Sequence, residues 1–103
     1  MDTKELSRLE RKIERVKKQL MAIQDMRPGK LSQQAHDPEK QRLYWQLSYT
    51  HHMKSRSEYV RPERLQRVRA EVDAFRHFKE LTQQWVDLAL ECAKLKDKLG
   101  SDK

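Results

Sequence analysis

Residues 61–99 read RPERLQRVRAEVDAFRHFKELTQQWVDLALECAKLKDKL, and this stretch decides the fold because it predicts one long helix with two apolar stripes. Its second half repeats apolar residues at alternating steps of three and four, the heptad pattern of a helix that packs on another helix. This heptad seam comprises Phe78, Leu81, Trp85, Leu88, Cys92, Leu95 and Leu99. The first half has the same spacing in Leu65, Val68, Val72 and Phe75. The step from Phe75 to Phe78 is three where the alternation requires four, so the two stripes point in different directions and we expect two neighbours.

The composition favours an elongated helical form or an oligomer. The chain has 103 residues, of which 36% are hydrophobic and 38% are charged, a small supply of core for a compact globule. Lys and Arg number 23 against 16 Asp and Glu, which gives a net charge of +7. Nucleic acid and acidic protein surfaces are the partner classes that this charge suggests.

The sequence contains no candidate membrane span, because no stretch approaches the roughly 20 consecutive apolar residues that a span needs. The first residues also begin no apolar run. We therefore expect a cytoplasmic protein with no membrane partner. Cys92, the single cysteine, falls on the heptad seam, so the simplest interpretation is a small buried apolar side chain.

The first part of the chain predicts a helix over about residues 3–26. Asp2 followed by Glu5 fits a capping box at the start of a helix. A second heptad seam follows through Leu6, Leu9, Ile13, Val16, Leu20 and Ile23. Because this seam matches that of the long helix in length, the simplest way to bury both is an antiparallel two-helix coiled coil.

The opposite face of this first helix carries five cations, again at steps of four and three. We call Lys4, Arg8, Arg11, Arg15 and Lys18 the basic stripe. One interpretation is a solvated face that keeps the helix soluble. The other is a surface that contacts successive phosphates without reading bases.

Residues 27–60 predict a break followed by a small sheet. Arg27-Pro28-Gly29 ends the first helix, because Pro28 disfavours a helical residue before it. A short strand is expected over residues 30–33 and a loop over residues 34–42. Residues 43–50 alternate apolar and polar side chains, the pattern of a half-buried strand, and a turn around residues 51–53 leads into residues 54–60. The result is a β-hairpin, or a three-stranded sheet.

The two faces of the hairpin have different expected roles. Leu43, Trp45 and Leu47 are expected to cover the first half of the long helix, with Trp45 as the main anchor. Tyr44, Gln46, Ser48 and Thr50 are expected on the other face, with Lys54 and Arg56 near them if the register allows.

Hydroxyls, an amide, a tyrosine and cations on a small sheet are typical of β-sheet proteins that bind nucleic acid, and also of any exposed sheet face. The predicted nucleic-acid-binding residues are Tyr44, Gln46, Lys54, Arg56, Arg61, Arg64 and Arg67. Arginine suits this role because its planar guanidinium binds phosphates and base edges with two hydrogen bonds. Salt bridges to Glu63, Glu71 and Asp73 are the alternative use of the arginines at the start of the long helix, which are Arg61, Arg64, Arg67, Arg69 and Arg76.

Three segments carry a family resemblance: residues 26–32 (MRPGKLS), residues 44–49 (YWQLSY) and residues 54–63 (KSRSEYVRPE). Together they resemble a family of short bacterial proteins of unassigned function, some of them encoded near transposases. Many members of that family place a cysteine-rich knuckle before the hairpin, whereas this chain has QAHDPEKQR at residues 34–42 and no cysteine there. The resemblance implies a mobile-element context and nucleic acid, and it assigns no catalytic residue.

The residues required for common catalytic and metal sites are missing from the sequence. No pair among His36, His51, His52 and His77 has the spacing or the cysteine partner of a zinc site. The two glycines, Gly29 and Gly100, provide no phosphate-binding loop. We therefore expect no enzyme activity, no metal, no cofactor and no small-molecule substrate.

The predicted architecture is α+β and mostly α, one domain over residues 1–103, with a coiled-coil stalk and a small antiparallel sheet packed on the start of a helix over about residues 62–99. A further apolar stripe on that helix predicts a homodimer. We call Phe75, Val86, Leu90 and Ala93 the dimer stripe. Two functions remain open: a non-enzymatic accessory protein that binds nucleic acid, DNA rather than RNA, through the hairpin, or a scaffolding module that binds or regulates another protein.

Overall fold

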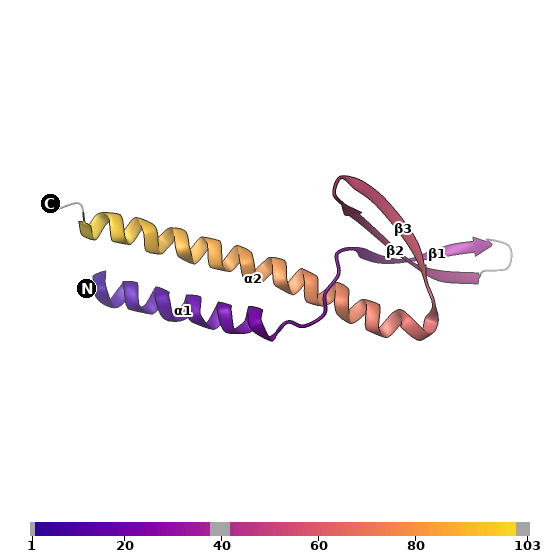
Figure 1. The fold of residues 1–103 in the computed structure, drawn as a ribbon, viewed down its shortest axis with the longest axis horizontal. Coiled ribbons are helices and arrows are strands. Elements are labelled where there is room, and N and C mark those ends of the chain that lie inside the picture. The colour runs from indigo at the N-terminus through magenta and orange to yellow at the C-terminus, as the bar shows by residue number, and fades with distance from the viewer. Residues whose placement is uncertain (1, 38–41, 101–103) are drawn as a thin grey trace. The chain divides into compact units, whose positions relative to one another are not determined.

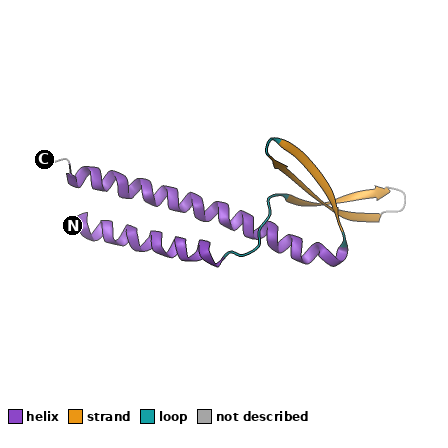
Figure 2. Cartoon of the chain, viewed as in Figure 1, coloured by secondary structure: helices purple, strands orange, loops and turns teal. Residues whose placement is uncertain are grey.

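The computed structural model describes residues 2–37 and 42–100 as two helices and three strands (Figure 2). In chain order these are α1 (Asp2–Ala22), β1 (Lys30–Asp37), β2 (Arg42–His51), β3 (Lys54–Val60) and α2 (Pro62–Gly100). The expected α+β class is confirmed. The contacts divide the chain into a helical unit, Met1–Gln24 with His77–Lys103, and a sheet unit, Asp25–Arg76. Helix α2 contributes its first turns to the sheet unit and the rest to the helical unit. That the two fold as a single domain stays a prediction.

In the helical unit, α1 and the second half of α2 lie side by side and antiparallel, so that the start of α1 and the end of α2 lie at the same end of the pair (Figure 1). The heptad seams are the buried faces: Leu9 and Val16 of α1 and Leu81 and Cys92 of α2 are 1–6% exposed. Cys92 thus has the expected role of a small buried side chain. Trp85, at the rim of the seam, is 36% exposed, and the Lys17 ammonium lies 5.2 Å from the centre of its ring.

Helix α1 ends at Ala22, so the expected end near Met26 was wrong. The N–H of Ile23 donates to the carbonyl of Leu20 at 3.1 Å, a tight closing turn after the last residue of the seam. Gln24, Asp25 and Met26 are exposed and add no apolar side chain to the helix pair. Without burial to support another turn, the chain leaves the helix before Pro28 requires an extended residue.

The sheet unit contains an antiparallel sheet in the order β1-β2-β3, with β2 in the centre. Strand β1 runs to Asp37, so a three-stranded sheet is present and the loop expected from residue 34 was wrong for residues 34–37 and for Arg42. Gln34 pairs with Tyr44 and Ala35 with Leu43, and the register shifts between Ala35 and Asp37. The rest of that loop, residues 38–41, lies outside the described residues. Backbone pairing, rather than an apolar pattern, makes this part of β1 a strand.

The core of the sheet unit lies between β2, β3 and the first turns of α2. Leu47, Val60, Val68 and Val72 are buried, and Leu31, Trp45, Tyr49 and Leu65 pack on them. The expected covering of α2 by Trp45 and Leu47 is confirmed, whereas Leu43 is 60% exposed and its expected burial was wrong. Strand β3 ends at Val60, opposite Trp45, and α2 begins at Pro62. Leu43 therefore lies beyond the part of β2 that α2 covers.

None of the described helices is long and apolar enough to cross a membrane.

Candidate nucleic-acid interface

The pairing register assigns each strand residue to one of two faces, because directly paired residues of antiparallel strands project to the same side. Gln46 pairs with Tyr59 and Ser48 with Ser57, on the face opposite the core. We call this the outer face. Its described members are Lys30, Ser32, Gln34, Tyr44, Gln46, Ser48, Thr50, Ser55, Ser57 and Tyr59.

Lys54 and Arg56 do not share the outer face with Tyr44 and Gln46. Lys54 pairs with His51, and Arg56 pairs with Tyr49, which packs on the core. The two cations therefore project from the side of the sheet on which α2 lies. The sequence analysis placed them near Tyr44 and Gln46 only if the register allowed it, and the register of the hairpin separates the two pairs.

Arg27 ties the segment before the sheet to both β3 and α2. Its Nη1 donates to Glu58 Oε1 at 3.4 Å, and its backbone N–H donates to the carbonyl of Glu71 at 3.1 Å. Its Nε lies 3.2 Å from Glu71 Oε1, a buried oxygen that it holds by charge attraction without hydrogen-bond alignment. We call these three contacts the Arg27 clamp. Through these contacts Arg27 pairs with two of the carboxylates of the sheet unit, those of Glu58 and Glu71.

Gly29 allows the clamp segment to enter the sheet closely. Its φ is +138°, and a Cβ at this position would lie 2.6 Å from Leu47 Cδ1 and 3.1 Å from the carbonyl oxygen of Ser48. Only glycine adopts this conformation without strain. The Arg27-Pro28-Gly29 sequence therefore has a structural use beyond ending a helix.

The five cations that the sequence predicted to bind nucleic acid have no carboxylate partner among the described residues. We call Lys54, Arg56, Arg61, Arg64 and Arg67 the five free cations, since none forms an ion pair with a side chain that the structure describes. Glu71 is held in the clamp, and Asp73 pairs with Arg76 at 3.8 Å. Glu63 forms no ion pair within the described residues. The alternative use of the arginines in salt bridges is thus present for Arg76, whereas Arg61, Arg64 and Arg67 form no ion pair within that part of the chain.

An open cleft of about 460 Å³ adjoins the clamp on the helix-facing side of the sheet. Its lining combines apolar, aromatic and charged side chains. The lining residues are Arg27, Pro28, Leu47, Tyr49, His51, Glu58 and Arg64. Arg64 is half-buried there and free of ion pairs with the described residues, so its guanidinium is available to an anion entering the cleft.

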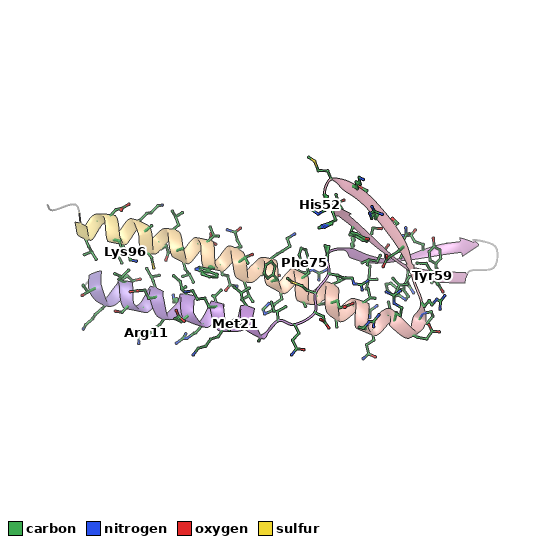
Figure 3. All side chains as sticks on the ribbon, in the orientation of Figure 1. Arg11, Met21, His52, Tyr59, Phe75 and Lys96 are labelled. Atoms are coloured by element: carbon green, nitrogen blue, oxygen red, sulfur yellow. The ribbon has the colours of Figure 1, made fainter. Side chains whose placement is uncertain are left out.

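The basic stripe belongs to the helical unit. All five of its residues are exposed, and Arg11 lies on the side of α1 away from α2 (Figure 3). Arg8 has a weak ion pair with Glu5 at 4.0 Å. The stripe is therefore a second available cationic surface, on a different unit from the five free cations.

One family model matches residues 6–70, and it describes a domain of unknown function, DUF6788. The chain belongs to the DUF6788 family. The match agrees with the expected family of unassigned function. No curated protein matches the chain, and neither does any solved structure.

The DUF6788 match includes most of α1, the whole sheet and the first turns of α2. The Arg27 segment, Gly29 and the five free cations all lie within it. Val86, Leu90 and Ala93 of the dimer stripe lie outside it and are exposed in the helical unit, whereas Phe75 is half-buried in the sheet unit. No group of three or more His, Cys, Asp or Glu able to hold a metal ion occurs among the described residues.

The sequence prediction missed Lys30, Ser32, Gln34, Ser55, Ser57 and Tyr59 as members of the outer face. The signal for the last three was present, since Ser and Tyr alternate with charged residues through Lys54–Val60. Which of these residues face outward can be predicted only when the length of the hairpin turn is known. His52 and Met53, with φ of 51° and 65°, form a two-residue hairpin turn and so set the register.

Proposed function

We propose that the sheet unit binds nucleic acid through phosphate contacts from the five free cations, and that the chain acts as a non-enzymatic accessory protein. The observation that carries this proposal is that none of the five has a carboxylate partner among the residues that the structure describes. Residues 25–76 contain eleven Lys or Arg and seven Asp or Glu, so an excess of cations is built into this unit. Because Glu58 and Glu71 are held by Arg27, those two carboxylates do not neutralise the hairpin.

The five free cations lie on two adjoining elements and on the residue that joins them. Lys54 and Arg56 extend from the edge strand β3, Arg61 links β3 to α2, and Arg64 and Arg67 follow at steps of three residues in the first turns of α2. Each such step advances about 4.5 Å along a helix, so the three guanidinium groups have separate positions for phosphate oxygens. Four of the five are arginines, which bind phosphate with two parallel hydrogen bonds. DNA in a mobile-element context is the ligand that the family resemblance suggests.

The test is a salt titration of binding to a labelled DNA duplex and to the corresponding single strand, followed by fluorescence anisotropy. Affinity is expected to fall steeply as salt rises from about 50 to 200 mM. Arg56→Ala with Arg64→Ala is expected to reduce the slope of log affinity against log salt by about two units, one for each lost phosphate contact. Arg76→Ala is the matched control, because this exposed arginine of α2 is already paired with Asp73. Absence of salt-dependent binding to either form would overturn the proposal.

A second candidate function, a module that binds another protein chain, is favoured by the exposed part of the dimer stripe. Val86 is 59% and Leu90 53% exposed, one helical turn apart on α2. An apolar pair on a helix that already buries another face is typical of an interface. We propose a second copy of the chain as its partner, with a test given in the Discussion.

A further inference from the structure

The outer face differs in charge from the rest of the molecule. Of the ten outer-face positions from the Gln34–Tyr44 pair to the hairpin turn, only Lys30 is charged, although 38% of the chain is charged. Seven positions carry hydroxyls or amides and two carry tyrosines. A face kept soluble without any other role would be expected to carry charges as the other surfaces do. The composition of the outer face therefore favours a ligand that is bound through aromatic and uncharged polar contacts.

The hydroxyls along β2 and β3 are mutually satisfied. Ser48 Oγ lies 3.4 Å from Ser57 Oγ, and Thr50 Oγ1 lies 3.3 Å from Ser55 Oγ. They form an uncharged surface toward the turn. The aromatic side chains lie toward the other end of the hairpin, where Tyr59 is labelled in Figure 3.

Tyr44 and Tyr59 form the aromatic part of the outer face. Their ring centroids are 6.0 Å apart and the rings are tilted by 48°. Tyr59 remains 55% exposed, so a large part of its ring is open to a ligand. Gln46 pairs directly with Tyr59, and its amide can donate to and accept from the edge of a base.

We propose that the outer face is a stacking site for unpaired bases, so that the nucleic acid is bound as a single strand. This inference rests on the proposed function and names the form of its ligand. The bases of a duplex are stacked on one another, so tyrosines on a sheet reach only bases that are unpaired. Lys30 on the same face and Arg61, two residues after Tyr59, provide cations for the phosphates of such a strand.

The experiment compares two labelled strands of the same length and charge, twelve thymidines and twelve abasic sites, at about 50 mM salt by fluorescence anisotropy. If a base stacks on Tyr59, the wild-type protein binds the thymidine strand about tenfold or more tighter than the abasic strand. Tyr59→Ala is expected to abolish this ratio, and Tyr59→Phe, which keeps the ring, to retain it. Leu43→Ala is the matched control, since Leu43 is an exposed apolar residue that projects from the opposite face of the same sheet.

The outcomes separate this inference from the proposed function. Equal, salt-dependent binding of both strands that Tyr59→Ala leaves unchanged would overturn the stacking site and leave the phosphate contacts standing. No salt-dependent binding of either strand would overturn both. Tyr59-dependent binding of a neutral soluble β-glucan, with no preference for thymidine over abasic strands, would assign the outer face to sugars instead. Far-UV circular dichroism establishes that each variant is folded before binding is compared.

Discussion

Arg27 and Glu71 are joined twice, by a backbone hydrogen bond of 3.1 Å and by an ion pair of 3.2 Å between their side chains. The first contact positions the chain where it enters the sheet, and the second places a charge beside a carboxylate oxygen that is buried. A further bond from the same guanidinium reaches Glu58 on β3. One residue outside any helix or strand therefore fastens β3 and α2 together.

Removing the Arg27 side chain is expected to destabilise the sheet unit. Arg27→Ala leaves the buried oxygen of Glu71 without a cation, and we expect a loss of about 2 kcal/mol in the free energy of unfolding. The estimate is below that for a fully buried pair because both side chains retain some exposure. Urea unfolding followed by circular dichroism measures the loss. Arg76→Ala, which breaks only the exposed pair with Asp73, is expected to cost under about 0.5 kcal/mol; an equal cost for both variants would contradict the clamp.

Trp45→Ala is expected to loosen the hairpin from α2. Trp45 packs on the core cluster, and the Arg69 guanidinium lies 4.9 Å from the centre of its ring. Because the ring is half-buried, we expect a loss of about 3 kcal/mol, at the lower end of the range for large aromatic side chains. Leu43→Ala, on the same strand and 60% exposed, is expected to cost under about 1 kcal/mol. An unchanged unfolding transition for Trp45→Ala would show that the other face of β2 is the buried one.

The two glycines provide a matched test of backbone strain. Gly29→Ala requires a side chain at a φ of +138° against Leu47 and the Ser48 carbonyl, so we expect a loss of about 2 kcal/mol or more. Gly100 is helical with open space around its Cβ position, and Gly100→Ala is expected to be neutral or slightly stabilising. Thermal melts of the two variants measure the difference. Similar melting temperatures would show that the close approach at Gly29 is not needed.

The exposed part of the dimer stripe predicts a concentration-dependent dimer. Light scattering during size-exclusion chromatography is expected to give the mass of a dimer at tens of micromolar, on the order of the concentrations where weak dimers populate. Val86→Glu introduces a charge among Leu90 and Ala93 and is expected to give monomers. Gln84→Glu adds the same charge at another exposed position of α2 and is expected to leave the dimer intact. A monomeric wild-type protein under these conditions would contradict the prediction.

Reversing two charges of the basic stripe tests which of the two units contacts the phosphates of the nucleic acid. Arg8→Glu with Arg15→Glu removes two exposed cations of α1 and introduces two carboxylates. If the five free cations form the site, we expect the salt slope of binding to change by less than for Arg56→Ala with Arg64→Ala. The salt slopes of the two double variants are compared by fluorescence anisotropy on the same labelled DNA. A larger loss from the α1 variant would assign the binding to the basic stripe.

The sequence was sufficient to predict the helices and the central strand because their signals are local. The heptad spacing of leucines predicted the faces that α1 and α2 bury, and the alternation around Trp45 and Leu47 predicted β2 and its inner side. The end of β1 could not be predicted, since Gln34 and Ala35 are held in a strand by backbone pairing with β2 rather than by an apolar pattern.

The candidate site depended more strongly on long-range geometry. A hairpin turn of two residues at His52 and Met53 sets which of Lys54 and Ser55 faces outward, and a shift of one residue would exchange the two faces of β3. The availability of the arginines depended on Arg27, which pairs with Glu58 at a distance of 31 residues along the chain. Neither relationship has a local signal that could reveal it.

The position of β3 at the edge of the sheet has a consequence for self-association. An open edge exposes backbone groups that could pair with the same edge of another molecule. Lys54 and Arg56 lie along this edge, so two copies approaching edge to edge bring like charges together. We therefore expect the cations proposed to contact phosphate also to oppose edge-to-edge association. Neutralising both residues is expected to lower the solubility of the protein, and a bound polyanion would screen the same repulsion between neighbouring copies.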